Sequence, residues 1–111
     1  MILNNGYYEV LIHKDLKKCI DKRKAPFNNN YILKAFQKKV EYLRADCSHP
    51  SLNFKPYTVS DTIKRRKGVD DIYEFYVNKS IRCLVYILEE QKELILYYVG
   101  NHNDIKQKAL K

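Results

Sequence analysis

The sequence has no tryptophan, only three glycines and three prolines, and no long run of apolar residues. A helix that crosses a bilayer needs roughly 18 consecutive apolar residues, so the sequence predicts no membrane-spanning helix. The first residues also lack the charged and apolar regions of a secretory signal peptide. We therefore expect a cytoplasmic protein without a membrane partner. The low glycine and proline content is not that of a fibrous or disordered chain.

Metal and cofactor motifs are also lacking. The three cysteines, Cys19, Cys47 and Cys83, are odd in number and form no C-x-x-C pair, which predicts neither disulfides nor a zinc site. His13 and His49 have no partner at metal-ligand spacing. No P-loop, H-E-x-x-H or G-x-G-x-x-G motif is present. We expect no metal and no cofactor.

Positive charge is abundant and unevenly distributed. The 111 residues carry a net charge of +8, and their length predicts one domain over residues 1–111. Residues 1–67 hold 15 basic and 6 acidic side chains, whereas residues 68–111 hold 6 basic and 7 acidic ones. Such a surface attracts nucleic acid, anionic membranes or acidic proteins, and the sign alone does not choose among them.

Hydrophobic spacing predicts a strand and two helices in the first half. Residues 7–12 are aromatic and β-branched, which is typical of a strand. An apolar stripe at helical spacing predicts a helix from His13 to about Ala25, before Pro26. Asparagines 28–30 can cap a second helix that reaches about Asp46, and the two helices should form a hairpin. The stripe of the second helix comprises Ile32, Leu33, Phe36, Val40 and Leu43.

The second half reads as three strands after a long connection. Residues 48–71 contain two prolines and a basic run, and a connection this long suggests a short hidden element. Strands are predicted at Ile72–Val77, Ile81–Glu89 and Glu93–His102, joined by short links that suit antiparallel hairpins. We predict an α+β fold of order β-α-α-β-β-β, with the helical hairpin packed on one face of a small, mainly antiparallel sheet.

The hairpin centres predict which side chains share a face. If the turns centre on Lys79 and Gln91, Arg82 lies opposite Tyr76 and Gly100. The apolar face should pack against the helices and the other should be open to solvent. The predicted open face carries Glu74, Tyr76, Arg82, Leu84, Tyr86, Leu96, Tyr98 and His102. The predicted apolar face carries Tyr73, Phe75, Val77, Ile81, Cys83, Val85, Ile87, Ile95, Tyr97 and Val99.

Two residues at one end of the open face suggest chemistry. The guanidinium of Arg82 can hold a phosphate and stabilise charge in a transition state, or it can simply pair with Glu74. His102 can transfer a proton near neutral pH, or it can merely bond backbone at a strand end.

Further residues suggest RNA binding. The basic run comprises Lys64, Arg65, Arg66 and Lys67 and can clamp a phosphate backbone, with Lys55 reaching the same side, or it can be a solvated loop. Its composition also allows a nuclear-localisation run. The tyrosines Tyr76, Tyr86 and Tyr98 can stack on bases or serve as ordinary sheet residues.

Three segments together resemble one known family. They are Gly68–Val77, with the run Ile-Tyr-Glu-Phe-Tyr; Ile81–Tyr86, with Arg82; and Tyr98–Ile105, with Val-Gly-Asn-His-Asn-Asp-Ile. Their order, after a strand and two helices, resembles the RelE/ParE superfamily of bacterial type II toxin–antitoxin toxins. The resemblance covers nearly the whole chain. Many members have a tyrosine where this chain has Lys106, so Tyr76 or Tyr98 would have to supply a required hydroxyl.

The resemblance implies a metal-independent mRNA endoribonuclease that inhibits translation in the bacterial cytoplasm, on mRNA in the ribosomal A site or on free mRNA. In such enzymes the RNA's 2′-hydroxyl attacks the adjacent phosphate. The matched catalytic residues are Arg82 and His102, with Tyr76 as the tyrosine. Lys55, the basic run and Tyr98 would contact RNA. An acidic antitoxin would wrap the basic surface and form a hetero-oligomer with the toxin. The alternatives are a ParE-like toxin that binds DNA gyrase and an RNA-binding or degenerate member.

Overall fold

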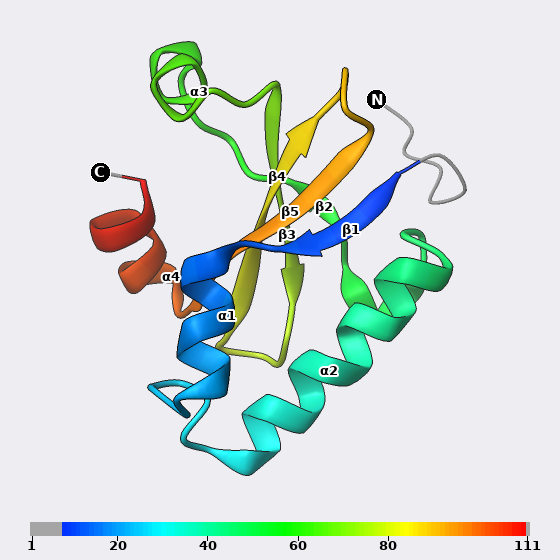
Figure 1. The fold of residues 1–111 in the computed structure, drawn as a ribbon, viewed down its shortest axis with the longest axis vertical. Coiled ribbons are helices and arrows are strands. Elements are labelled where there is room, and N and C mark those ends of the chain that lie inside the picture. The colour runs from blue at the N-terminus through cyan, green and yellow to red at the C-terminus, as the bar shows by residue number, and fades with distance from the viewer. Residues whose placement is uncertain (1–7, 111) are drawn as a thin grey trace.

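A computed structural model describes residues 8–110 and contains a five-stranded sheet with helices on both faces (Figure 1). The strands are β1 (Glu9–Ile12), β2 (Lys55–Pro56), β3 (Asp71–Tyr76), β4 (Arg82–Leu88) and β5 (Glu93–Gly100). The α-helices are α1 (Lys14–Asp21), α2 (Asn30–Ala45), α3 (Asp61–Lys67) and α4 (His102–Asp104). Two further helical turns are η2 (Pro50–Leu52) and η3 (Ile105–Ala109), the second of which continues α4.

The sheet has the order β1-β5-β4-β3-β2. β1 runs parallel to β5, and every other neighbouring pair is antiparallel. The predicted α+β fold and mainly antiparallel sheet are therefore confirmed. The predicted strand ends agree with the structure to within two residues, except that Tyr7 lies outside the described residues.

The helical hairpin of α1 and α2 is confirmed, with a shorter first helix. α1 ends at Asp21 rather than near Ala25, because Arg23 has a φ of 53°, which is outside the right-handed helical region. The side chain of Asn29 caps α2 by accepting hydrogen bonds from the amides of Tyr31 and Ile32. No helix formed by residues 8–110 is both long and apolar enough to cross a membrane.

The main core lies between this hairpin and one face of the sheet. The predicted stripe of α2 packs there: Leu33, Phe36, Val40 and Leu43 are buried, and Ile32 is partly buried against them. Opposite them lie side chains of all the long strands, among them Phe75, Cys83, Val85 and Val99. Packing of a helical stripe against the apolar side of a sheet is the arrangement that the sequence predicted.

Part of the opposite face of the sheet is covered rather than open. Ile72, Leu84 and Tyr86 are buried there beneath Ile105 and Ala109 of η3. The C-terminal helical segment, residues 102–109, therefore supplies a second, smaller core. The prediction of a solvated face was wrong over this part of the sheet, because Ile105 and Ala109, one helical turn apart, pack on it.

A bulge changes the predicted faces of β5. Pairs from Arg82↔Gly100 to Leu84↔Tyr98 follow the predicted register, but the pairing then shifts between Leu84 and Val85. One extra residue in a strand reverses the alternation of all side chains beyond it. Leu96 consequently packs in the main core, and Ile95 and Tyr97 lie with the second core. The predicted faces of Leu96, Ile95 and Tyr97 were therefore wrong.

The long connection contains the short elements η2, β2 and α3. The basic run is helical rather than a loop, since Ser60 caps the start of α3 and Gly68 ends it with a φ of 71°. Glycine suits that left-handed position because it has no Cβ. The four cations occupy the last turn of α3, where positive charge is favoured by the helix dipole.

Candidate functional site

Six polar and aromatic side chains gather near the turn that joins β3 to β4. We call this group the Arg82 cluster; its members are Lys55, Tyr57, Glu74, Tyr76, Arg82 and His102. The register explains their meeting, because Lys55 pairs with Glu74, and Tyr76 pairs with Arg82, on one face of three adjacent strands. Cross-strand partners project to the same side of a sheet.

Arg82 and Glu74 form an ion pair. Nη1 of Arg82 donates a hydrogen bond of 3.2 Å to Oε1 of Glu74, whose residue is only 4% exposed. The side chain of Arg82 is 25% exposed. This is the pairing that the sequence offered as an alternative to phosphate binding. The two roles are compatible, since a guanidinium has five N–H donors and the carboxylate also orients it.

Tyr76 lies between two cations. Lys55 Nζ donates a hydrogen bond of 3.3 Å to the Tyr76 hydroxyl. Lys55 Nζ is also 5.0 Å from the ring centroid of Tyr76, and Arg82 Cζ is 4.7 Å from it. The Lys55 hydrogen bond, with smaller contributions from the charges of Arg82 and Lys55, lowers the pKa of Tyr76 below its ordinary value. The hydroxyl therefore loses its proton more readily than that of an ordinary tyrosine.

Tyr57 completes the cluster and was not predicted from the sequence. Its amide donates to the carbonyl of Ile72 at 2.8 Å, so the segment continues the alignment of β2 beyond Pro56. Burial, together with the charge of Glu74, raises the pKa of Tyr57, partly offset by Arg82. Its hydroxyl thus keeps its proton. Lys55 and Tyr57 are two residues apart, which would place both side chains on one face of a strand. The surrounding segment has no other strand pattern, so the sequence did not predict a strand there.

His102 meets the cluster at Tyr57. The two ring centroids are 6.5 Å apart. His102 does not end a strand as predicted; it begins α4, because the side chain of Asn101 caps that turn by accepting from the amide of Asp104 at 2.8 Å. His102 is exposed, so its imidazole is accessible to a ligand on the Arg82 cluster.

The basic run lies away from the Arg82 cluster. Figure 1 shows α3 at one end of the sheet and the turn between β3 and β4 at the other. Along β3, Asp71 and Tyr76 are separated by roughly 16 Å at about 3.3 Å per residue. Lys64 pairs with Asp71 at 3.3 Å, and Arg66 donates to the carbonyl of Leu110 at 3.2 Å. The expectation that Lys55 would reach the same side as the basic run was therefore wrong.

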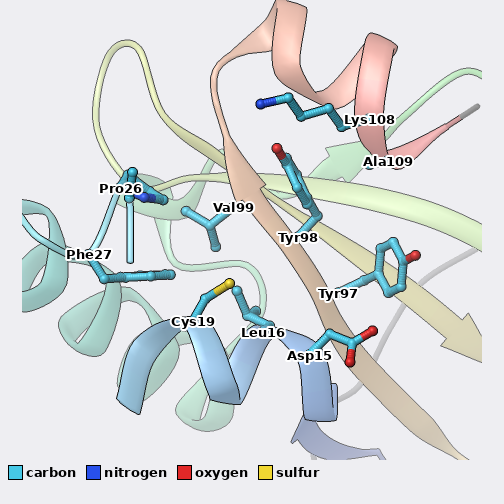
Figure 2. A pocket seen from close by; sticks show the side chains of 11 residues that line it. Asp15, Leu16, Cys19, Pro26, Phe27, Tyr97, Tyr98, Val99, Lys108 and Ala109 are labelled. Carbon is cyan, nitrogen blue, oxygen red and sulfur yellow. The ribbon is translucent and has the colours of Figure 1, made fainter. Parts of the chain in front are cut away.

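Tyr98 occupies a different cleft. Figure 2 shows its side chain beside Lys108, above a hollow of about 270 Å³ lined by α1, the segment 25–27, β5 and η3. Burial, then the charge of Asp104, raises the pKa of Tyr98. An added Cβ at Gly100 would lie 2.8 Å from Cε2 of Tyr98, so a larger residue there would displace that ring.

Burial and grouping bear on two further points. Tyr86 is only 6% exposed beneath the C-terminal helical segment, so its ring is not available to stack on a base as the molecule stands. Within residues 8–110, no three or more His, Cys, Asp and Glu side chains group in a way that could hold a metal ion.

Comparisons with known proteins agree on the fold. No protein-family model matches the sequence, and no curated protein matches it. Among solved structures, RelE in the RelE–RelB complex of the archaeon Pyrococcus horikoshii matches with a TM-score of 0.57 and 14% identity, over 86% of this chain and 94% of that one.

Two toxin structures from Helicobacter pylori match as well. A metal-bound toxin has a TM-score of 0.55 and 18% identity, and a copper-bound mutant toxin has 0.57 and 15%. Each match covers 88% of this chain and 98% of the other. The strand order, the helical hairpin and these matches lead to one conclusion: the protein has the RelE-like toxin fold.

Proposed function

We propose that the protein is the toxin of a type II toxin–antitoxin system and that it cleaves mRNA at the Arg82 cluster. The observation that carries the proposal is the meeting of Arg82, Tyr76 and Lys55 on one face of the sheet, with direct contacts among them. This arrangement combines a phosphate-binding cation with a hydroxyl of lowered pKa, and the two can serve as charge stabiliser and general base in the cleavage of RNA by its own 2′-hydroxyl.

The proposed reaction is a transesterification within the RNA. The 2′-oxygen attacks the adjacent phosphorus and loses its proton, so a P–O2′ bond forms. The P–O5′ bond breaks, and the leaving 5′-oxygen takes up a proton. The products are a 2′,3′-cyclic phosphate and a free 5′-hydroxyl. No metal, water or redox partner enters this balance.

Tyr76 fits the role of general base. Its hydroxyl is within hydrogen-bond distance of Lys55, which favours the phenolate form that accepts the 2′-proton. Arg82 then places its remaining N–H donors on the phosphate and stabilises the charge that develops there. Glu74 acts as a positioning residue, since it fixes the guanidinium from a buried site.

The proton for the leaving group can come from His102 or Tyr57. His102 is exposed at the start of α4, and Tyr57 retains its hydroxyl proton because burial and Glu74 raise its pKa. The two rings are neighbours. We assign His102 as general acid and Tyr57 as the residue that positions it, in keeping with the exposure of each side chain.

The partner we propose is an acidic antitoxin. The P. horikoshii relative was solved as a RelE–RelB complex, and this chain has a net charge of +8 to attract an acidic protein. An antitoxin segment that folds on this surface would also cover the Arg82 cluster. The mRNA substrate is proposed to be bound in the ribosomal A site.

Controlled expression in a bacterium tests this function. The wild type, the Arg82→Lys variant and the control variant Lys34→Gln, which changes an exposed cation on α2, are compared for growth and for new mRNA 5′ ends. We expect wild type and Lys34→Gln to stop growth and to create cleavage ends, and Arg82→Lys to do neither. Growth arrest without new ends would favour a gyrase-directed toxin, and absence of any effect would favour an RNA-binding or degenerate member.

A further inference from the structure

A second cleft lies at the α3 end of the sheet, remote from the Arg82 cluster. It has a volume of about 430 Å³ and is walled by the end of α3, the residue before α1, and β4 and β5. Its lining includes two cations, Arg66 and Lys67, and no carboxylate. The lining residues are His13, Arg66, Lys67, Gly68, Val69, Tyr86, Leu88, Ile95 and Tyr97.

Two stacked tyrosines form the floor of this cleft. The rings of Tyr86 and Tyr97 are 4.3 Å apart with an interplanar angle of 18°. His13 meets the Tyr97 ring edge-on at 5.0 Å, and Lys67 Nζ lies 5.7 Å from the centroid of that ring. A cation that lies over a half-buried aromatic face can be replaced there by another planar or positive group.

The two tyrosines support each other. Burial, then the charge and hydrogen bonding of Tyr97, raises the pKa of the Tyr86 hydroxyl, which is itself buried. Tyr86 therefore backs the stack from inside, and the half-buried ring of Tyr97 is the surface that faces the cleft.

These observations require a ligand with two properties. The cations of the rim, with no acid among them, select a phosphate group. The Tyr97 ring, backed by Tyr86 and covered by the Lys67 ammonium, selects a flat aromatic group. A nucleotide combines the two.

We propose that this cleft binds one nucleotide of the RNA, separately from the phosphate that is cleaved at the Arg82 cluster. Arg66 and Lys67 hold its phosphate, and its base packs on Tyr97 where the Lys67 ammonium now lies. The inference rests on the proposed function, because it assigns this second site to the same RNA. It also gives α3 a role despite its distance from Arg82.

Nuclear magnetic resonance on the Arg82→Lys protein tests the cleft with uridine 5′-monophosphate and with inorganic phosphate as probes. We expect the nucleotide to shift amide signals of residues 66–69 and 97, and to bind at least tenfold more tightly than inorganic phosphate. The double substitution Arg66→Gln/Lys67→Gln and, separately, Tyr97→Leu should each weaken nucleotide binding at least tenfold. Lys34→Gln should leave it unchanged.

Two results would overturn the proposal. Equal affinity for phosphate and nucleotide would reduce the cleft to a bare anion site, and signal shifts confined to the Arg82 cluster would place the nucleotide there instead. The cleavage test above is independent. If Arg82→Lys fails to abolish cleavage while the cleft binds nucleotide, the assignment of the active site fails and the cleft stands.

Discussion

At the residue scale, the central feature is a buried carboxylate that depends on one arginine. Glu74 is 4% exposed, and its carboxylate accepts a hydrogen bond from the guanidinium of Arg82. A buried charge that loses its partner destabilises a fold much more than the pair itself stabilises it. Arg82 therefore contributes both to the proposed chemistry and to the stability of the fold. Different substitutions of Arg82 are needed to measure the two contributions separately.

We predict that Arg82→Ala lowers the free energy of unfolding by about 1–3 kcal/mol, somewhat less than for fully buried pairs because Arg82 is partly exposed. The double variant Arg82→Ala/Glu74→Gln should recover part of this loss, since the stranded carboxylate is gone. Urea denaturation measures both. Equal stability of Arg82→Ala and wild type would show that Glu74 does not need the pair.

A second residue-scale prediction concerns the pH profile. Because Lys55 lowers the pKa of Tyr76, the phenolate forms at lower pH than for an ordinary tyrosine. If Tyr76 is the base, cleavage rises with pH through this lowered pKa. Lys55→Met removes the largest cause, so the pKa rises toward the ordinary tyrosine value of about 10 and the rising limb moves to higher pH.

The pH–rate profiles of wild type, Lys55→Met and Tyr76→Phe check this. Tyr76→Phe should lose the limb altogether. An unchanged limb in Lys55→Met would remove Tyr76 from the role of base.

The sequence predicted some of these contacts and missed others for definite reasons. Arg82 lies opposite Tyr76 and Gly100 as predicted, because that part of both hairpins is regular. Tyr57 was missed, since a strand of two residues is too short to show alternation.

At the element scale, caps decide where the helices begin. Oδ1 of Asn29 accepts from the amides of Tyr31 at 2.9 Å and Ile32 at 3.3 Å. Loss of such a cap leaves amides at the helix start without partners. The neighbouring Asn28 is exposed and makes a suitable control.

We predict that Asn29→Ala destabilises the protein by about 1 kcal/mol, whereas Asn28→Ala changes stability by less than about 0.5 kcal/mol. Thermal unfolding measures the difference, which corresponds to a fall in Tm of roughly 4–8 °C for a domain of this size. A similar Tm for both variants would mean that the Asn29 bonds contribute no net stability.

The elements that the sequence failed to predict are short or irregular. The second core depends on η3, whose two buried residues carry too weak a periodicity to predict a helix. The bulge after Leu84 adds one residue to β5, and no glycine marks it in the sequence. The long strands and α2 were predicted because their apolar patterns are continuous over many residues.

At the scale of the whole molecule, the two groups of cations that we propose to contact RNA lie in places that the structure keeps apart. Lys55 and Arg82 serve the Arg82 cluster, and α3 carries the other group at the far end of the sheet. An RNA that contacts both ends would release counterions from several phosphates.

We therefore predict that RNA binding by the Arg82→Lys protein weakens steeply with salt. When the logarithm of the binding constant is plotted against the logarithm of the salt concentration, the steepness of the slope should fall by roughly 0.7 for each phosphate contact removed. The double substitution Arg66→Gln/Lys67→Gln should make the slope shallower by the amount expected for one or two lost phosphate contacts. Lys34→Gln should leave the slope unchanged. Titrations at several salt concentrations provide the slopes, and an identical slope in the double variant would exclude α3 from the RNA interface.

The central claim is cleavage of RNA by its own 2′-hydroxyl, and the chemistry of the new ends tests it most directly. RNA from cells expressing wild type or Arg82→Lys is ligated to an adaptor that accepts only 5′-hydroxyl ends, and the same RNA is ligated after phosphorylation as a control. We predict new 5′-hydroxyl ends, paired with 2′,3′-cyclic phosphates, in wild type alone. New ends that carry a 5′-phosphate, or ends that persist in Arg82→Lys, would contradict it.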